Sequence, residues 1–511
     1  MTTDKMGVCA VICAAVGALI YALLAFSVIM PQPYPYFGVD IYNAYFYRLL
    51  DGRFDLPLRM LTFEGHYSAD GTAILYHGIA PLLTRLVLYP FVALEDFPTA
   101  AFSIWLWSVV GTGFYHLALF QVIRKYMGQI PLLWVVLMAV AIWVSSPGFL
   151  LTTNTVLYHE PTSIAYAAMA IAVYLMVRCA LFGLAWRYVL IPTALMAGVL
   201  LHARPHMAVG LYAGVAVMIA LALWENAKGT RLRVFVSIVI LGLVGASFLQ
   251  FNSLRFGSAT SAHGQIEMPD RNSQVQYGPV FLGNDASVTG RLRVFVEHGR
   301  FHPWRVLPNT ALYIFDFPPT SADTSGGAIA TLHRSVTEGI SGYGFIEAPR
   351  FGMVFIWPAW IVLMVIGLGL GRPRLSGGPR ALPVLIATGI AAGLMLAYPT
   401  VAFRYRFDVW PVVMALCLLS LPGLIQRFGP ELLKIPRVLS MSLIIVVFGV
   451  FMSGRVAIPY KQSYQQGAGQ TYETWDADRC LSRLATKDFS PERLAELCVD
   501  PETVFQERQR G

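Results

Sequence analysis

Long apolar stretches separated by short polar connections dominate the chain. A helix needs about 20 mostly apolar residues to cross a bilayer, and uncharged stretches close to that length recur up to residue 453. The first stretch is longer than the core of a signal peptide, about 7–15 residues, so we expect a retained first helix. The pattern predicts eleven spanning helices, at residues 7–30, 99–122, 131–150, 162–182, 188–202, 206–224, 234–251, 351–370, 381–399, 408–425 and 438–453.

A twelfth apolar stretch, residues 77–94, differs from the others. It contains Arg85 near its middle, together with Pro81 and Pro90. A charged residue at the centre of a bilayer costs at least about 2.5–3.5 kcal/mol on insertion scales. We therefore expect an interfacial or re-entrant segment here rather than a spanning helix.

Composition and charge agree with an all-α integral membrane protein. Of the 511 residues, 56% are hydrophobic and 13% are charged, about half the charged share of a soluble domain. The net charge of +8 comes from cations in short loops, which is typical of cytoplasmic loops rather than of nucleic-acid binding. With a cytoplasmic N-terminus, each of the five short cytoplasmic loops carries two or three cations: Arg124 and Lys125; Arg178 and Arg187; Lys228, Arg231 and Arg233; Arg372, Arg374 and Arg380; Arg427, Lys434 and Arg437.

This topology divides the chain into four parts. Residues 1–251 form an N-terminal transmembrane module that includes a first outer loop, 31–98. A large outer loop, 252–350, leads to the C-terminal helices, 351–453, and residues 454–511 form a polar extracytoplasmic tail. Cys480 and Cys498 lie in that tail and could pair if it faces an oxidising compartment.

Three arginines break the charge rule on the outer side. Arg204 lies in LHARPH, and Arg404 and Arg406 lie in AFRYRFD. Such cations indicate an anionic partner, or else lipid headgroups or local ion pairs. Arg404 and Asp408 would share one helix face. Arg404 and Arg406 would point to opposite sides of a helix, so both serve one site only if the segment is irregular.

Asp40 is the main candidate acid. It follows the first predicted helix within PYFGVDIYNAYFYRLLDGRFDLP, among aromatic residues suited to a membrane interface. A general base for a lipid substrate has to lie near the membrane surface, although an ordinary loop acid is the alternative. Asp51 and Asp55 are weaker candidates, because DGRFD is typical of a turn.

Several other polar residues are accessory candidates. His159 and Glu160, in LYHEPT, lack a third ligand at a recognisable spacing, so we predict no metal site and no cofactor, with a divalent metal as the alternative. Glu160 could instead act as a second acid, or the pair could cap a helix that begins near Thr162. His66, Tyr67 and Asp70 could line an acceptor path. Arg255 could contact a lipid phosphate or anchor a helix end.

A family resemblance bears on these candidates. Residues Val39 to Leu56 resemble the start of the first outer loop of GT-C class membrane glycosyltransferases, such as protein O-mannosyltransferases and the lipid A aminoarabinose and galacturonic acid transferases. GHYSADGTAILYHGIAPLLTRLVLYPF, NTVLYHEPT, HARPH, FNSLRFGS and FRYRFDVWP resemble later landmarks of that class, in the same order. The resemblance implies a GT-C-like helix bundle, a polyprenyl-phosphate-linked sugar as donor, and Asp40 in the position of the catalytic acid. One departure is that no Asp-Glu pair follows the first helix.

The residues and the resemblance together lead to a hypothesis. Asp40 takes the proton from an acceptor hydroxyl, and the oxygen attacks the anomeric carbon with inversion. Arg404, Arg204 and Arg406 supply cations for the phosphate that leaves. The acceptor is an envelope glycan, lipid or protein at the outer face of the cytoplasmic (inner) membrane. A transporter or flippase for a lipid-linked or anionic solute, and a non-catalytic assembly factor, are the alternatives.

Overall fold

The structure is a computed structural model. It describes residues 4–31, 36–226, 229–260, 275–283, 294–295, 297–317, 327–342, 344–347, 349–370, 376–465 and 475–509. Lys228, Arg372 and Arg374, three of the predicted cytoplasmic cations, lie outside these ranges.

Long apolar helices form the body of the molecule. Eight helices of the described part are long and apolar enough to cross a membrane, and the chain is a multi-pass membrane protein. These helices are α1 Lys5–Ala25, α5 Thr99–Met127, α8 His159–Phe182, α10 Pro205–Trp224, α11 Arg231–Phe256, α18 Leu382–Leu396 with the preceding η4 Gly378–Ala381, α19 Arg406–Phe428 with the preceding η5 Phe403–Tyr405, and α20 Pro436–Gln462.

The other three predicted spans coincide with shorter apolar helices. These are α6 Leu132–Val144, α9 Leu190–Ala203 and α17 Pro358–Leu370. Two predicted spans are interrupted before a proline, because a proline lacks the amide hydrogen that would continue the helix. The short α7 Pro147–Leu151 follows α6, and the short α16 Met353–Ile356 precedes α17. The existence of each apolar helix is confirmed, whereas the count of eleven spans stays a prediction.

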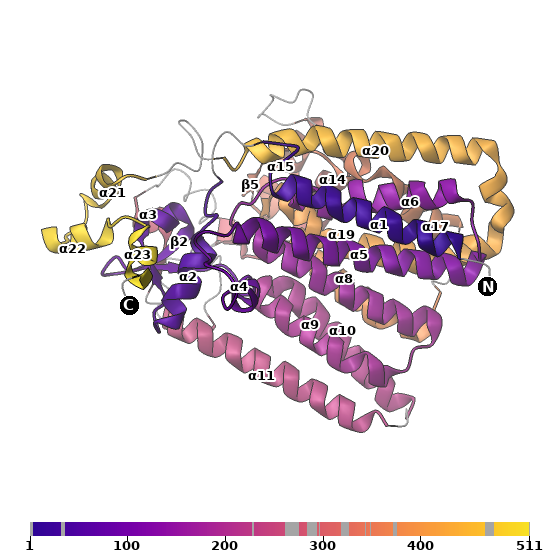
Figure 1. The fold of residues 1–511 in the computed structure, drawn as a ribbon, viewed down its shortest axis with the longest axis horizontal. Helices are drawn as coiled ribbons and strands as arrows, with labels where there is room; N and C mark the ends of the chain where they lie inside the picture. The colour runs from indigo at the N-terminus through magenta and orange to yellow at the C-terminus, as the bar shows by residue number, and fades with distance from the viewer. Residues whose placement is uncertain are drawn as a thin grey trace.

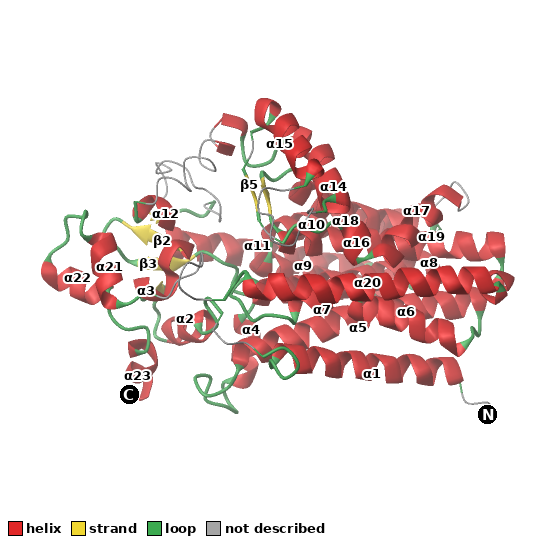
Figure 2. Cartoon of the chain, turned by 90° about the horizontal axis from the view of Figure 1, so that it is seen from above, coloured by secondary structure: helices red, strands yellow, loops and turns green. Residues whose placement is uncertain are grey.

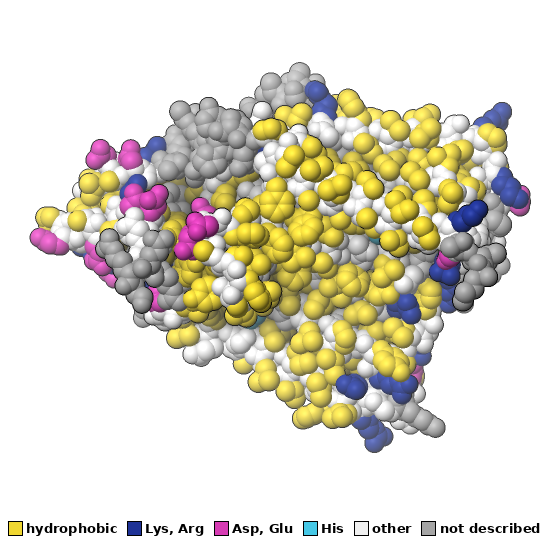
Figure 3. All heavy atoms as spheres, in the orientation of Figure 1, with side chains coloured by type: hydrophobic (Ala, Val, Ile, Leu, Met, Phe, Trp, Pro, Cys, Tyr) yellow, Lys and Arg dark blue, Asp and Glu magenta, His cyan; other side chains and the backbone are white. Residues whose placement is uncertain are grey.

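The long helices run side by side, with the chain termini at opposite ends of the bundle (Figure 1). Helices α8 and α19 are the most buried of the eight, whereas α11 is the least buried and lies at the margin. Visible Lys and Arg side chains gather mainly at the end that holds the N-terminus, and Asp and Glu at the other end (Figure 3). The two ends of the bundle therefore differ in charge, as expected for a membrane protein whose Lys and Arg residues lie mainly on one side of the membrane.

The segment with Arg85 does not cross the bundle. Its only helix in the described chain, α4 Leu82–Leu88, has seven residues and is about 10 Å long at 1.5 Å per residue, much too short to span a bilayer. This agrees with the expected interfacial or re-entrant segment.

The loops at the end of the bundle that holds the C-terminus contain the remaining described elements. They include two small sheets, which the predicted all-α fold did not include. Antiparallel strands in the order β1-β3-β2-β4 join the first and the large outer loops, and β5 pairs with β6 in parallel. The strands are β1 Asp55–Leu56, β2 Gly65–Ser68, β3 Ala73–Leu75, β4 Val275–Tyr277, β5 Phe345–Ile346 and β6 Thr400–Val401. The helices are α2 Ile41–Leu50, α3 Leu58–Leu61, η1 Thr62–Glu64, α12 Gly278–Phe281, η3 Pro303–Arg305, α14 Val306–Phe315, α15 Ala328–Ile340, α21 Ala477–Leu484, α22 Pro491–Leu497 and α23 Thr503–Gln509. Outside this set lie η2 Trp186–Tyr188 and η6 Pro430–Lys434.

The polar tail packs against the first outer loop. Helix α20 continues to Gln462, so the tail begins later than residue 454. Arg59 Nε donates to the carbonyl oxygen of Trp475 at 3.0 Å, and Arg48 Nη1 lies 2.9 Å from the Glu507 carboxylate. The tail thus contacts α2, the helix whose N-terminus is capped by Asp40.

A disulfide joins Cys480 and Cys498, whose Cα atoms are 5.7 Å apart. We expect the double variant Cys480→Ser/Cys498→Ser to lose about 2–4 kcal/mol of the tail's local stability, because the cross-link restricts the unfolded segment between the two cysteines. Limited proteolysis of the purified protein should cleave the tail faster in this variant than in wild type. Cys9→Ser, a change at a free cysteine of α1, is the control, and equal cleavage rates in all three proteins would contradict the prediction.

Candidate functional site

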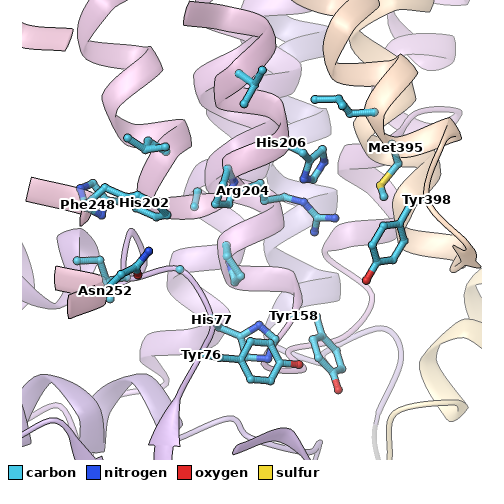
Figure 4. Close-up of a pocket in the computed structure, with 18 of the residues that line it drawn as sticks. Tyr76, His77, Tyr158, His202, Arg204, His206, Phe248, Asn252, Met395 and Tyr398 are labelled. Carbon is cyan, nitrogen blue, oxygen red and sulfur yellow. The ribbon is translucent and has the colours of Figure 1, made fainter. Parts of the chain in front are cut away.

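A cavity of about 420 Å³ lies where several spanning helices end on the loop side. The beginning of α8, the junction of α9 with α10 and the ends of α11 and α18 form most of its wall. Figure 4 shows side chains from these elements directed toward a common space. The residues that carry its chemistry are Tyr76, His77, Tyr158, His202, Arg204, His206, Asn252, Arg255, Arg300, Tyr398, Arg404 and Tyr405.

The loop after β3 forms one wall because it packs tightly against the end of α9. The amide of Ala80 donates to the carbonyl oxygen of His202 at 2.9 Å. At Gly78 a Cβ atom would lie 2.3 Å from that same oxygen, so no larger residue fits without a backbone shift. The Tyr42 hydroxyl of α2 donates to the Gly78 carbonyl at 3.1 Å. The first outer loop is thereby fixed to the rim of the cavity.

Arg204 enters the cavity because the helix breaks at this residue. Its backbone is extended, with φ −143°, between the end of α9 and Pro205, which starts α10 with its fixed φ. Its guanidinium donates to Thr162 Oγ1 at 2.7 Å and forms an ion pair with Asp408. His206 Nε2 lies 3.2 Å from the same carboxylate. The expectation that Arg404 and Asp408 share one helix face is wrong, since Arg404 lies in η5 and Asp408 in α19, where it pairs with Arg204.

Arg404 lies in the short η5 and reaches the cavity from another side. Its Nη1 lies 2.8 and 3.0 Å from the two carboxylate oxygens of Glu347 and donates to the Tyr464 hydroxyl at 3.1 Å. The pairing of β5 with β6 brings Glu347 beside Val401, whose carbonyl accepts from the Glu347 amide at 2.8 Å. The guanidinium carbon also lies 4.3 Å from the ring centre of Tyr158, a cation–π distance.

Two further arginines of the cavity have no carboxylate partner among the described residues. Arg255 donates to the carbonyl oxygens of Leu75 and His77, both at 3.1 Å, and to Asn252 Oδ1 at 2.9 Å. Arg300 forms no ion pair with any residue of the described chain. The described lining therefore holds four arginines and three histidines, without an aspartate or glutamate. A concave wall of this composition favours an anionic ligand.

Arg406 does not belong to this site. It is buried, and its guanidinium carbon lies 5.1 Å from the ring centres of both Tyr313 and Phe403. Arg406 begins α19 directly after η5, so its side chain and that of Arg404 point in different directions. The alternative in which both arginines serve one site is thus not realised.

Asp40 does not line the cavity. It caps α2 without a side-chain capping hydrogen bond, is exposed, and forms no ion pair or side-chain hydrogen bond with the described residues. Its segment is connected to the wall, because the amide of Leu157 donates to the carbonyl of Phe37 at 3.1 Å. Partial loss of hydration raises the pKa of Asp40, and the nearby positive charge of Arg85 offsets part of this rise.

Glu160 forms a buried ion pair with Arg85. The two side chains are 1% exposed or less, and Arg85 binds both carboxylate oxygens, with Nη2 to Oε1 at 2.9 Å. Helix α8 begins at His159 rather than near Thr162, with no side-chain cap, so the predicted capping role is wrong. His159 is bound elsewhere, since its Nε2 lies 2.6 Å from the Tyr460 hydroxyl rather than near Arg85. The described part of the chain contains no group of three or more His, Cys, Asp or Glu that could hold a metal ion.

The three candidates of the first outer loop, His66, Tyr67 and Asp70, do not line the cavity. His66 is packed among aromatic rings, and burial together with the charge of Arg255 lowers its pKa to about 3. Tyr67 stacks on Phe281 with ring centres 4.8 Å apart. Asp70 lies 3.3 Å from Arg493 of the tail. All three therefore have structural partners in the outer loops.

Glu64 is an acid that the sequence analysis missed. It accepts a hydrogen bond from the Tyr76 hydroxyl and lies 3.8 Å from His77 Nε2, behind two residues of the cavity wall. Burial raises its pKa, but hydrogen bonds and the charge of His77 outweigh this and lower the pKa to about 2. Glu64 is thus an acid that lies behind the wall, beside His77.

Comparisons with known proteins give structural likeness only. No protein-family model matches the sequence, and neither does a curated protein. A crystal structure of the Archaeoglobus fulgidus oligosaccharyltransferase is similar at 15% identity and a TM-score of 0.46, over 94% of this chain and 58% of that chain. The chain thus spans less than two thirds of the oligosaccharyltransferase. ArnT from Cupriavidus metallidurans, solved with undecaprenyl phosphate, is similar at 13% identity and a TM-score of 0.44, over 98% of this chain and 88% of that chain.

The likeness to these two structures concerns the fold alone. At such low similarity they assign no role to any residue of this chain. The roles proposed below rest on the geometry of the cavity and on the position of Asp40.

Proposed function

We propose that this protein is a membrane glycosyltransferase that uses a polyprenyl-phosphate-linked sugar. The observation that carries the proposal is the cavity with four arginines, three histidines and no carboxylate in its described lining, at the loop ends of spanning helices. A lipid-linked phosphate combines a negative charge with a tail that stays in the bilayer. This location and this charge suit such a ligand better than they suit a soluble sugar.

In the proposed reaction the donor phosphate lies in the cavity and the acceptor hydroxyl approaches from the side of Asp40. Asp40 accepts the hydroxyl proton while the oxygen forms a bond with the anomeric carbon. The bond between that carbon and the phosphate oxygen breaks, and its electron pair leaves with the lipid phosphate. Arg255 and Arg300, which have no carboxylate partner in the described chain, stabilise the growing charge on the phosphate, with Arg204 and Arg404 nearby.

This assignment refines the role of the arginines. Arg204 and Arg404 are each neutralised by a carboxylate, so they contribute less net charge to a ligand than their number suggests. Arg406 lies elsewhere and is dropped as a phosphate ligand. The proposed acceptor is an envelope glycan, lipid or protein, and the proposed topology places the N-terminus in the cytoplasm and the tail outside.

Transfer itself is the decisive test. Purified protein in proteoliposomes is incubated with a radiolabelled polyprenyl-phosphate sugar and extracted envelope acceptors. We expect label to move onto an acceptor and the unlabelled lipid phosphate to appear in equal amount. Movement of the labelled lipid between leaflets without transfer would instead identify a flippase and overturn the proposal.

Arg300 provides a test of phosphate binding that leaves the surrounding structure intact. Arg300→Gln should weaken binding of a polyprenyl phosphate about tenfold, because a hydrogen bond to a charged group contributes about 1.5–3 kcal/mol and this site is partly exposed. Thermal-shift titration or ligand-induced fluorescence gives the Kd. Arg334→Gln, an exposed arginine of the same large loop on α15, is the matched control. Equal Kd values in all three proteins would remove Arg300 from the phosphate site.

A further inference from the structure

Helix α14, in the large outer loop, exposes an apolar side that a helix of a soluble domain would bury. Trp304, just before the helix, is 70% exposed, and Leu307 is 80% exposed. Phe315, on the same side of the helix, is 53% exposed. On the opposite side, Arg305 and Asn309 are buried together with the apolar Leu312 and Tyr313. A soluble helix turns its apolar stripe toward the core and its charges toward water.

Hydrogen bonds from polar residues hold the buried side of α14 in place. Arg305 Nε donates to the carbonyl oxygen of Ser341 at 3.0 Å. Asn309 Nδ2 donates to the carbonyl oxygens of Leu396 and Tyr398 at 2.6 and 2.9 Å. These bonds fix the rotation of α14 about its own axis, so the apolar side has to face outward.

Helix α15 repeats this arrangement. Leu332, Val336 and Ile340 follow one another at a spacing of four, which places them on one side of the helix, and all three are exposed. The buried side carries His333 and Thr337, and His333 Nε2 lies 2.6 Å from Asn309 Oδ1 of α14. The outward stripes of α14 and α15 contain no charged residue. Arg334 and Glu338 are exposed on the side of α15 opposite this stripe, because each lies two positions after a stripe residue, so the helix has a charged face and an apolar face.

The two helices lie at the level where the spans end. Asn309 binds Leu396, the last residue of α18, and α14 packs against α15, α16 and α18. In Figure 2, α14 and α15 stand out from one side of the bundle, close to its loop-bearing end. The polar boundary of a bilayer has to lie close to the ends of the spanning helices, and Trp304 is a residue type enriched at that boundary.

We propose that α14 and α15 lie in the membrane interface of the loop-side leaflet. Trp304, Leu307, Leu332, Val336 and Ile340 contact lipid, and the charged side of α15, with Arg334 and Glu338, faces the headgroups and water. An exposed apolar face with a charged face on the other side, at the level of the span ends, is the arrangement of an interfacial helix. The partner is the lipid surface itself. The inference goes beyond the proposed transfer activity and does not depend on it.

The placement also defines where the cavity meets the bilayer. Arg300 and Phe301, which line the cavity, directly precede η3 and α14. Because α14 and α15 lie in the leaflet, they hold one edge of the cavity at the depth of the lipid headgroups.

Spin-label depth measurements on the full-length protein in proteoliposomes test this inference without any activity assay. Cys9 and Cys13 are replaced by serine, while the buried Cys179 and Cys417 and the disulfide stay. Single cysteines are introduced as Val336→Cys and Glu338→Cys and carry a nitroxide. Leu243→Cys, on the exposed apolar side of α11, is the bilayer reference.

We expect the label at 336 to collide with oxygen several-fold more often than with a water-soluble nickel chelate, as at 243. The label at 338, on the opposite, charged side of α15, should show a clearly smaller ratio. Equal access of both reagents to 336 and 338 would show that the stripe faces water and would overturn the inference. A label at 336 that is shielded from both reagents would mean that protein covers the stripe, which would overturn it equally.

Discussion

Replacing Asp40 with asparagine is expected to lower the rate of sugar transfer by about 10²- to 10⁴-fold, the usual contribution of a general base. The amide keeps the size of the side chain but does not accept the proton of the acceptor hydroxyl. Asp40 is exposed and forms no ion pair with described residues, so the variant should fold and melt like wild type. Initial rates with a polyprenyl-phosphate sugar, together with thermal melting in detergent, measure both effects.

Asp51→Asn is the matched control for this prediction. Asp51 lies at the other end of α2 in the same outer loop, and its replacement should leave the rate within about twofold of wild type. Full activity of Asp40→Asn would remove Asp40 from the catalytic role and would leave the cavity without its proposed base.

The pH dependence of the same reaction distinguishes a base from a residue that merely shapes the loop. A base acts in its ionised form, so the wild-type rate should fall as the pH drops through the pKa of Asp40. Because that pKa is raised, the fall should begin above the range of an ordinary aspartate, whose pKa is about 3.9. The residual rate of Asp40→Asn should lack this acidic limb. An acidic limb that persists unchanged in the variant would contradict a base role for Asp40.

Local sequence pattern predicted the helices well, because an apolar stretch of sufficient length has few alternatives in a membrane. It also indicated that residues 77–94 do not span, since Arg85 has no place in a bilayer without a partner. The small strands were beyond prediction. A strand of two residues, such as β5 or β6, carries no periodicity of its own and exists only through its pairing.

The partners of the site residues were equally out of reach. Arg204 binds Asp408, 204 positions later in the chain, and Arg404 binds Glu347, 57 positions earlier. Both contacts arise only when the helices assemble, so the sequence indicated three stray cations without showing that two are neutralised. The motif HARPH did contain His202 and His206, whose position on either side of Arg204 was a usable signal. Arg300 had no such signal, because its segment EHGRFHPWR resembles an ordinary loop.

The ion pair between Arg85 and Glu160 supports the second large effect. Both side chains are at most 1% exposed. Breaking such a buried pair by removing one partner typically destabilises a protein by about 3–5 kcal/mol, because the other charge stays buried without compensation. We therefore expect Arg85→Met and Glu160→Gln each to lower the free energy of unfolding by roughly that amount, measured by denaturation in mixed detergent micelles.

A double-variant cycle separates this pairing from simple loss of packing. In Arg85→Met/Glu160→Gln neither charge remains, so the combined loss should be well below the sum of the two single losses. The exposed pair of Arg53 and Asp55 is the control, and Arg53→Met should cost less than about 1 kcal/mol. Additive losses at Arg85 and Glu160 would show that the two charges do not stabilise each other.

The same variants should also affect transfer, because Arg85 connects the first outer loop with the bundle. Its Nε donates to Asn43 Oδ1 of α2 at 3.0 Å, while its other nitrogens bind Glu160 at the start of α8. Asn43 lies one turn after Asp40 on the helix that Asp40 caps. Loss of Arg85 frees this end of α2 relative to the cavity, so kcat should fall even at temperatures where the variant remains folded. A variant with lowered stability but unchanged kcat would limit Arg85 to a structural role, since a charge that positions Asp40 has to change the rate when it is removed.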